Sequence, residues 1–547
     1  MFPAEKFLIP RPLKTRSEFS VAWFYPNTYT VGMAGLGYQL VFRLLDADED
    51  IGVLRGFTDM EEPGISGASI FGFTFSWELD YANIVSILRK HNIPVSAKER
   101  DESHPLIFGG GPVLTANPEP FADIFDIVLL GDAEVAVPSF LSAYREARKA
   151  SSRRQQLLSL ANADGIYIPQ FYEVQYHDNA KQGDGSIAAI TPSVSGVPAY
   201  PRKKVFAPPP DYVAHSMVLS PETAWGNMFL VEVVRSCPQE CRFCLASFLT
   251  RPFRATNVDA LIDAVELGLK HTNKIGLLGP SVTEHPKFDE IAARLRGRED
   301  LSLSIASVRA DTLSENILST LVSLGQKSVT IAIESGSERL RSIMKKNLTE
   351  EEILHAVSLV EAAGLESIKF YGIAGLPHET QADLDETVRL LTHLKKKHKR
   401  LRFVFGISSF VPKAQTPFQW NGRDKDCGKK LEYVRKHLSK IGIDVRPESH
   451  NWSDIQALLS RGDRRLHPIL KSVEENSGNL GAWKKAIKEA NQNIVSMPNV
   501  KDYYIFRDIP REEILPWSHL QDEEKTQYLG KHNDSALALS LQSSAQS

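Results

Sequence analysis

Short apolar runs that end in glycine or proline and lead into helical patterns recur along most of this 547-residue chain, and this alternation constrains the fold most strongly. In the first part of the chain these runs are Ser20–Tyr25, Ala68–Thr74, Pro105–Gly109 and Asp126–Leu130. Continuous apolar strands of this kind are typical of parallel sheets that helices cover on both faces. We therefore expect residues 1–150 to form a doubly wound α/β domain. Ligands bind beyond the carboxyl ends of such strands, where Gly109, Gly110 and Gly111 are expected.

The alternation stops over residues 151–224, which carry hairpin-like runs and then a proline-rich connector. It resumes with six strand candidates, Phe229–Val234, Ile275–Leu278, Leu303–Val308, Val329–Glu334, Ser367–Tyr371 and Phe403–Ser409. Helical patterns separate them, so residues 225–420 are predicted to form a partial β/α barrel of the TIM type, two units short of a complete one. Residues 421–530 favour a helical C-terminal domain, and the polar composition of 531–547 predicts a disordered tail.

The composition of the chain argues against several classes of function. Lys and Arg number 64 and Asp and Glu 67, a net charge of −3 that argues against a general nucleic-acid coat or a polybasic membrane binder. No run approaches the roughly 18 apolar residues of a membrane-spanning helix, and the first residues lack the apolar core of a signal peptide. Four cysteines in all exclude a secreted fold held by disulfides. We expect a cytoplasmic protein without a membrane span.

The cysteines are unevenly placed. Cys237, Cys241 and Cys244 fall within eight residues, whereas Cys427 stands alone and has no assigned role. Three thiolates on one loop can converge on one metal centre, and soft thiolates suit zinc or an iron–sulfur cluster. A structural zinc site would normally have a fourth Cys or His in a paired arrangement, and none is near. A cubane cluster with three protein ligands leaves one iron open to a substrate, and the loop follows the first predicted barrel strand, where barrel active sites lie.

This loop resembles the signature of the radical S-adenosylmethionine (SAM) superfamily, in which three cysteines hold a 4Fe–4S cluster and an aromatic residue precedes the last. In that superfamily the open iron takes the amino and carboxylate groups of SAM. Reductive cleavage then gives methionine and a 5′-deoxyadenosyl radical that abstracts a hydrogen atom. The resemblance implies that Cys237, Cys241 and Cys244 hold the cluster and that Phe243 lies beside the adenine. It also implies an electron donor such as flavodoxin or ferredoxin.

Segments farther along are similar to successive strand ends of radical SAM barrels, most of all those of methylthiotransferases and cobalamin-fold enzymes. They are Ser307–Asp311, Ile331–Leu340 and Lys369–Thr380. By this resemblance Arg309 and Glu334 face SAM, and Gly375 and Glu379 lie by its adenosine end; a structural ion pair or a helix cap is the alternative for each.

The chain departs from the family after the second barrel strand. The usual Gly-Gly-Glu-like segment is Leu278-Gly279-Pro280 here, so the contact to the amino group of SAM falls to Ser281, Thr283 or backbone carbonyls.

The N-terminal segments Phe108–Val113, Pro118–Asp123 and Gly131–Glu134 resemble the cobalamin-binding Rossmann-like fold that precedes many radical SAM barrels. The motif Asp-x-His-x-x-Gly, which supplies a lower axial histidine in some cobalamin proteins, is absent. Relatives with this fold include both cobalamin binders and proteins that bind none. The resemblance thus leaves cobalamin open, with Gly109, Gly110 and Gly111 as candidate contacts.

Three functions remain open. The first is a cobalamin-dependent methyltransferase or another enzyme that functionalises a C–H bond. The second is a methylthiotransferase-like modifier of RNA or protein, but that group carries a second cysteine trio and residues 1–236 contain no cysteine. The third is a non-catalytic cluster-binding or assembly protein. The substrate, small or macromolecular, is not encoded in any motif, and no catalytic residue beyond the cofactor contacts is identified.

Overall fold

The computed structural model describes residues 2, 4–12, 17–177, 185–493 and 499–544. The chain divides into two compact units. Unit 1 comprises residues 1–207, 216–227 and 455–526, and unit 2 comprises residues 208–215, 228–454 and 527–547.

Unit 1 is built around a six-stranded sheet of order β3-β2-β4-β5-β6-β7, in which only β7 runs antiparallel to its neighbour. The strands are β2 (Phe19–Phe24), β3 (Ile51–Gly56), β4 (Ile70–Thr74), β5 (Leu106–Gly110), β6 (Ile127–Leu129) and β7 (Ile166–Tyr167). The direction of crossover reverses between β2 and β4, which is the switch point where doubly wound sheets bind ligands. The predicted doubly wound parallel sheet is confirmed.

Two strands of this sheet, β3 and β7, were not predicted as its members. Strand β7 lies in the segment expected to be hairpin-like, and β3 was missed because Arg55 interrupts its apolar run. The Arg55 guanidinium is buried and forms ion pairs with Glu5 at 2.8 Å and with Glu62 at 2.8 Å. Those two carboxylates, seven and 50 residues away in the sequence, compensate the buried charge within the strand.

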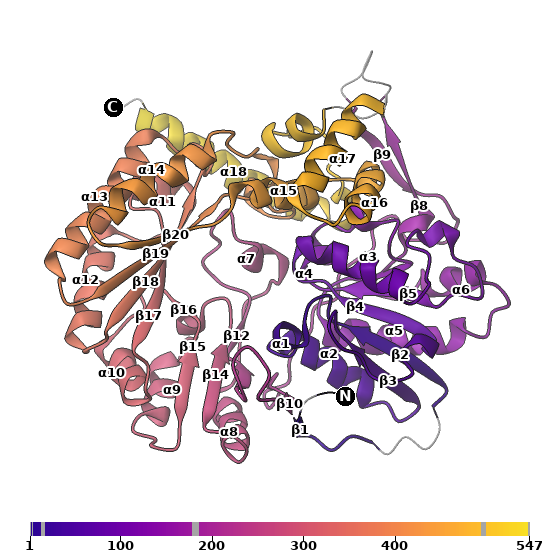
Figure 1. Cartoon of the computed structure of the whole chain (residues 1–547), viewed down its shortest axis with the longest axis horizontal. Helices are drawn as coiled ribbons and strands as arrows, with labels where there is room; N and C mark the ends of the chain where they lie inside the picture. The colour runs from indigo at the N-terminus through magenta and orange to yellow at the C-terminus, as the bar shows by residue number, and fades with distance from the viewer. Residues whose placement is uncertain (1, 3, 13–16, 178–184, 494–498, 545–547) are drawn as a thin grey trace. The chain divides into compact units, whose positions relative to one another are not determined.

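Helices cover both faces of this sheet (Figure 1), with α3 on one side and α2 and α5 on the other. The helices of the N-terminal part are α1 (Tyr29–Gly32), α2 (Leu36–Asp46), α3 (Tyr81–Lys90), α4 (Pro112–Ala116), α5 (Ala133–Ala147) and α6 (Arg153–Leu160). Two short antiparallel pairs complete the unit, β1 (Lys6–Phe7) with β10 (Val218–Leu219) and β8 (Tyr172–Tyr176) with β9 (Ile187–Pro192).

Unit 2 contains a series of parallel strands that follow chain order, paired as β11-β14-β15 and then β16-β17-β18-β19-β20. They are β11 (Phe229–Glu232), β14 (Lys274–Leu278), β15 (Ser302–Ile305), β16 (Ser307–Val308), β17 (Ser328–Glu334), β18 (Ser367–Ala374), β19 (Arg402–Ser409) and β20 (Asp444–Pro447). The predicted partial β/α barrel is confirmed, and β20 adds a parallel strand that the sequence pattern did not reveal. The small pair β12 (Val234–Arg235) and β13 (Arg254–Ala255) lies at the end of β11.

The helices between these strands lie on the outer side of the curved sheet (Figure 1). They are α8 (Val258–Leu269), α9 (Phe288–Leu295), α10 (Glu315–Ser323), α12 (Glu350–Ala362), α13 (Gln381–Lys397) and α14 (Cys427–Ser439). Two shorter helices, α7 (Leu245–Leu249) and α11 (Glu338–Ile343), belong to the loops at the strand ends. Side chains fix where they begin: Asn257 caps α8, Ser314 caps α10, and Thr349 and Glu352 form a capping box on α12.

The region predicted as a helical C-terminal domain, residues 421–530, divides between the two units. Its α14 and β20 complete unit 2, and most of α15 (His450–Arg461), α16 (His467–Glu475) and α17 (Leu480–Asn493) belongs to unit 1.

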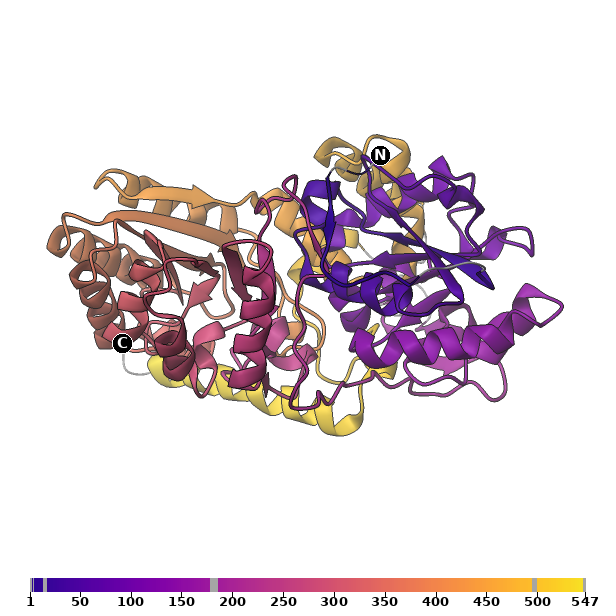
Figure 2. The same cartoon turned by 90° about the horizontal axis from the view of Figure 1, so that it is seen from below.

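The tail predicted to be disordered over 531–547 is instead helical as far as Ser544, as the second part of α18 (Glu523–Ser544). Figure 2 shows α18 running along unit 2. The reason is burial: Leu529 and Ala536 are both 0% exposed, so one face of a polar helix is covered by apolar neighbours. Residues 545–547 lie outside the described residues.

Within the described part of the chain, every helix is too short or too polar to cross a membrane.

Candidate functional site

The three clustered cysteines lie on the loop that follows β12, at the carboxyl edge of the unit 2 sheet, and Cys244 is the residue just before α7. Cys241 is buried, Cys237 and Cys244 are partly exposed, and none forms a disulfide. Burial raises the pKa of the Cys241 thiol to about 12 and also raises the pKa of Cys237. Cys244 contributes to both increases, so its sulfur atom lies within electrostatic range of the other two.

The cysteine loop is fastened to the turn that follows α11. The Arg242 backbone N–H donates to the Met344 carbonyl oxygen at 2.9 Å, and the Arg242 guanidinium donates to the Ser342 carbonyl at 3.2 Å. Lys345 Nζ donates to Glu240 Oε2 at 2.7 Å. Two segments a hundred residues apart are thereby held edge to edge beside Cys241.

Left-handed backbone at non-glycine residues concentrates around this loop. In unit 2 it occurs at Ser236, Glu240, Glu334, Lys345, Asn347, His378 and Gln415. Such conformations cost of order 1–3 kcal/mol each, and they persist where the surroundings fix them, as at functional sites.

Glu334 ends β17 in the left-handed conformation, with a φ of 63°, where the register with β18 shifts. Its carboxylate accepts a hydrogen bond from Lys346 Nζ at 3.1 Å, and both side chains are about nine-tenths buried. The structure therefore places Glu334 close to the cysteine loop, together with a lysine that the sequence motifs did not reveal.

Arg309 is also buried at this edge, but its guanidinium is already bound. It pairs with Asp311 at 2.7 Å and with Glu284 at 3.0 Å, and it donates to the Lys346 carbonyl at 3.3 Å. These contacts match the structural ion pair that was the alternative for this residue. The Arg309 side chain therefore stabilises the turn that contains Lys346.

Gly375 and Glu379 form a second, connected group at the end of β18. The Gly375 N–H donates to Glu379 Oε2 at 2.8 Å, and Lys430 Nζ donates to the same carboxylate oxygen at 2.9 Å. Gly375 has a φ of 74°, and a Cβ there would lie 2.9 Å from Cys427 Sγ. Cys427, which had no predicted role, thus packs against this turn, and its thiol donates to the Ala374 carbonyl at 3.3 Å.

Phe243 packs against a buried apolar cluster that joins several strand ends to α18. The cluster consists of Leu340, Ile343, Met344, Leu376, Phe410, Phe418 and Ala536. Phe243, next to Cys244 in the sequence, is only partly buried.

The unusual Leu278-Gly279-Pro280 segment is explained by close packing. A Cβ on Gly279 would lie 2.8 Å from the Val234 carbonyl oxygen, so a side chain does not fit there. Ser281 and Thr283 are buried just beyond it, and Thr312 donates to the Thr283 hydroxyl at 2.7 Å.

In unit 1, the glycines after β5 serve internal packing. A Cβ on Gly109 would lie 2.5 Å from the Phe125 ring, and one on Gly111, whose φ is 110°, would lie 2.8 Å from the Phe75 carbonyl oxygen. Gly110 has only ordinary contacts, the nearest to Leu129 at 3.6 Å. The space next to Gly109 and Gly111 is therefore filled by the chain itself.

The donor set fits an iron–sulfur cluster. Three thiols lie on one loop whose backbone is fixed, with a buried member and two partly exposed ones. Throughout the described residues, no three His, Cys, Asp or Glu side chains lie close enough to hold a single metal ion. A cubane takes each thiolate on a different iron and so needs a wider spacing than one ion does.

A cysteine loop at the carboxyl edge of a parallel β/α sheet, preceded by a doubly wound domain, defines a class of iron–sulfur enzymes. The family models agree: residues 37–169 match the model described as "Radical SAM proteins, N-terminal" and residues 231–391 match that of the "Radical SAM superfamily". The uncharacterised protein MJ0966 of Methanocaldococcus jannaschii is 30% identical over 85% of this chain and 94% of its own length. The chain therefore belongs to the radical SAM superfamily, whose enzymes use SAM and a 4Fe–4S cluster.

Two other similarities are informative. The tRNA-2-methylthio-N(6)-dimethylallyladenosine synthase of Stenotrophomonas maltophilia is 22% identical over 45% of this chain and 54% of its own. The structure of the radical SAM methyltransferase TsrM from Kitasatospora setae, with cobalamin and a 4Fe–4S cluster bound, superposes with a TM-score of 0.51. That match has 12% identity and covers 87% of this chain and 99% of the other, so the two proteins share a fold over nearly their whole length.

Sequence reasoning missed the polar partners of the cysteine loop. Lys345 and Lys346 sit in a turn of no regular pattern, and Tyr528, whose hydroxyl donates to Glu240, lies in the segment before the expected tail. The one available signal was the pair of lysines immediately after an apolar helix end, which the sequence alone cannot distinguish from surface charge.

Proposed function

We propose that this protein is a radical SAM enzyme that uses Cys237, Cys241 and Cys244 to hold a 4Fe–4S cluster and that transfers a methyl group with the help of cobalamin bound by unit 1. When bound and reduced, the cluster supplies the electron that cleaves SAM. The observation that carries the proposal is the position of the three-thiol loop at the carboxyl edge of the parallel sheet of unit 2.

The residues of unit 2 would act by binding and shielding. Phe243 would stack beside the adenine of SAM. The Glu334 carboxylate, at the strand edge, would contact a hydrogen-bond donor of SAM or its positively charged end. Gly375 and Glu379 would hold the turn that faces the adenosine, because Glu379 is already committed to the Gly375 N–H and to Lys430. Arg309 would position the Lys346 turn.

Cobalamin binding by unit 1 is supported by the strand order, since a large ligand at a switch point lies between the loops after β2 and β4. Trp77 follows β4 and is 49% exposed, so it offers an aromatic surface to a flat macrocycle. Gly109, Gly110 and Gly111 would contact the ligand through their backbone, since the space beside Gly109 and Gly111 is filled by the chain itself. The fold shared with TsrM, whose structure holds cobalamin, also supports this assignment.

A methylthiotransferase-like reaction is disfavoured by the sequence of unit 1. The relatives of that kind match less than half of this chain, and the first 236 residues contain no cysteine for a second cluster. A low-potential electron donor such as flavodoxin or ferredoxin would supply the reducing equivalent.

Cobalamin content tests the proposal. Protein purified from cells grown with cobalamin should carry about one corrinoid per chain, read from its absorbance after extraction. Trp77→Ala should lower that content at least tenfold, because it removes the exposed aromatic face at the switch point. Tyr200→Ala is the matched control, since Tyr200 is an aromatic residue of the same unit that is 65% exposed and lies outside the loops after β2 and β4. Protein that retains cluster and SAM cleavage but never binds cobalamin would contradict the methyltransfer proposal.

A further inference from the structure

Lys346 is held in one position by a strained and heavily bonded turn. Its neighbours Lys345 and Asn347 are both left-handed, with φ of 55° and 46°. The Lys346 N–H donates to the Arg341 carbonyl at 2.8 Å, and its own carbonyl accepts from Arg309. A turn with two unfavourable residues persists only when its surroundings fix it.

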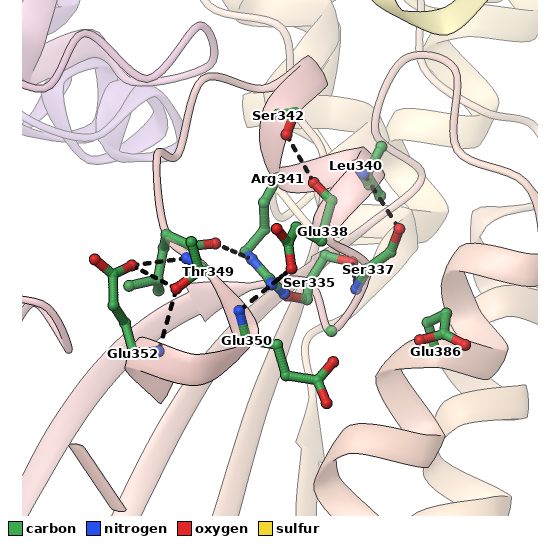
Figure 3. A network of polar contacts seen from close by, with 12 residues as sticks. Ser335, Ser337, Glu338, Leu340, Arg341, Ser342, Thr349, Glu350, Glu352 and Glu386 are labelled. Atoms are coloured by element: carbon green, nitrogen blue, oxygen red, sulfur yellow. Dashed lines mark hydrogen bonds and ion pairs between the residues drawn. The ribbon is translucent and has the colours of Figure 1, made fainter. Parts of the chain in front are cut away.

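Arg341 anchors that turn from the other side. Its guanidinium, 1% exposed, donates to the Ser335 carbonyl at 2.8 Å and to the Leu348 carbonyl at 2.6 Å. Figure 3 shows Arg341 pointing from α11 toward Ser335 and toward the chain just before Thr349. The end of β17, which carries Glu334, and the turn that carries Lys346 are thus bound to the same side chain.

The Lys346 ammonium is a buried charge beside the cluster loop. It donates to the Glu334 carboxylate, while the loop segment Glu240–Arg242 is fastened to the two residues before it. The Glu334 carboxylate, which is about as buried as the ammonium and lies 3.1 Å from it, compensates the positive charge of Lys346.

We infer that Lys346 is a positioning residue for electron entry: its fixed ammonium stabilises the more negative, one-electron-reduced state of the cluster held at Cys241, and Glu334 opposes it. This inference rests on the proposed cluster. The electron comes from an external low-potential one-electron donor, and the ammonium keeps its proton throughout. A buried charge acts strongly because little water screens it.

An EPR-monitored redox titration of the anaerobically reconstituted full-length protein, without SAM, tests the inference. Lys346→Met should lower the ratio of reduced to oxidised cluster at a fixed potential by about tenfold, a midpoint shift of about −59 mV for a one-electron couple. Glu334→Gln should shift the midpoint in the opposite direction, because it leaves the ammonium unopposed. Lys346→Arg should keep the wild-type midpoint.

The opposite signs separate charge from structure. A merely structural pair would move both midpoints in the same direction or neither, and either result would overturn the inference. If Lys346→Met does not fold, the sign of the Glu334→Gln shift still decides. Lys327→Met, which removes an exposed lysine of the same unit, should leave the midpoint unchanged. Iron content is measured first: wild-type protein that takes up no cluster contradicts the proposed function, whereas normal iron content with an unmoved midpoint contradicts only the role of Lys346.

Discussion

At the scale of single residues, Gly111 tests whether the glycine-rich segment after β5 exists for packing. Its φ is 110°, and a Cβ there would lie 2.8 Å from the Phe75 carbonyl oxygen. Gly111→Ala should therefore lower the free energy of unfolding by about 2 kcal/mol or more. Gly67→Ala, at a glycine with open space around it, should change it by less than about 0.5 kcal/mol. Urea denaturation without any cofactor measures both, and equal effects would contradict the packing explanation.

Asp80 provides a pH-dependent prediction. It lies just after β4, and burial raises the pKa of its carboxyl to about 6, although a hydrogen bond from Asn27 acts in the lowering direction. A folded-state pKa above the unfolded value means that the stabilising contribution is present below about pH 3.8 and is lost as the pH rises through about 6. Asn is neutral at every pH, so the unfolding free energy of Asp80→Asn relative to wild type should increase as the pH rises from about 3.8 to about 6. A difference in unfolding free energy that does not vary with pH would contradict this.

Some residues of the candidate site could be predicted from the sequence, and others could not. Cysteine spacing identified the loop now seen at the sheet edge, because metal-binding loops are local in sequence. Lys346 and the buried Arg341 were not foreseen, since only the folded chain brings Lys346 to the Glu334 carboxylate and Arg341 to two backbone carbonyls. The ion pairs of Arg309 with Asp311 and Glu284 were not foreseen for the same reason, and its predicted contact with SAM stays a prediction.

At the scale of elements, the apolar runs predicted nearly every parallel strand of both sheets, because a fully buried strand must be apolar throughout. The strands that were missed, β3 and β20, carry charged residues such as Arg55 and Asp444 and are recognisable only from their partners. Helix α18 was missed because it buries a narrow face within a polar composition.

The buried face of α18 leads to a prediction about the stability of the protein and its retention of iron. Ala536 is 0% exposed in the apolar cluster that supports Phe243, so Ala536→Asp would bury a carboxylate there and should cost at least about 2 kcal/mol of unfolding free energy. It should also speed the loss of iron to a chelator. Leu541→Asp, at a position 62% exposed on the same helix, should do neither. Equal rates of iron loss in the two variants would show that α18 does not support the cluster loop.

At the scale of the whole molecule, one chain combines a sheet that is doubly wound, with a switch point between β2 and β4, and a parallel β/α series with a three-thiol loop. The first arrangement suits a large planar ligand and the second suits a cluster and SAM, which is why we propose methyl transfer with cobalamin. Family membership could be anticipated from the cysteine loop and the strand-end motifs. The substrate could not, because no local motif encodes its contacts.

The most direct test of the central claim is the iron content and 5′-deoxyadenosine yield of reconstituted Cys241→Ala beside Cys427→Ala. Wild type and Cys427→Ala should each bind about four iron ions per chain and release 5′-deoxyadenosine from SAM after reduction, because Cys427 lies outside the cluster loop and contacts Gly375 and the Ala374 carbonyl. Cys241→Ala should lose both properties. Retention of the cluster and of SAM cleavage in Cys241→Ala would contradict the account.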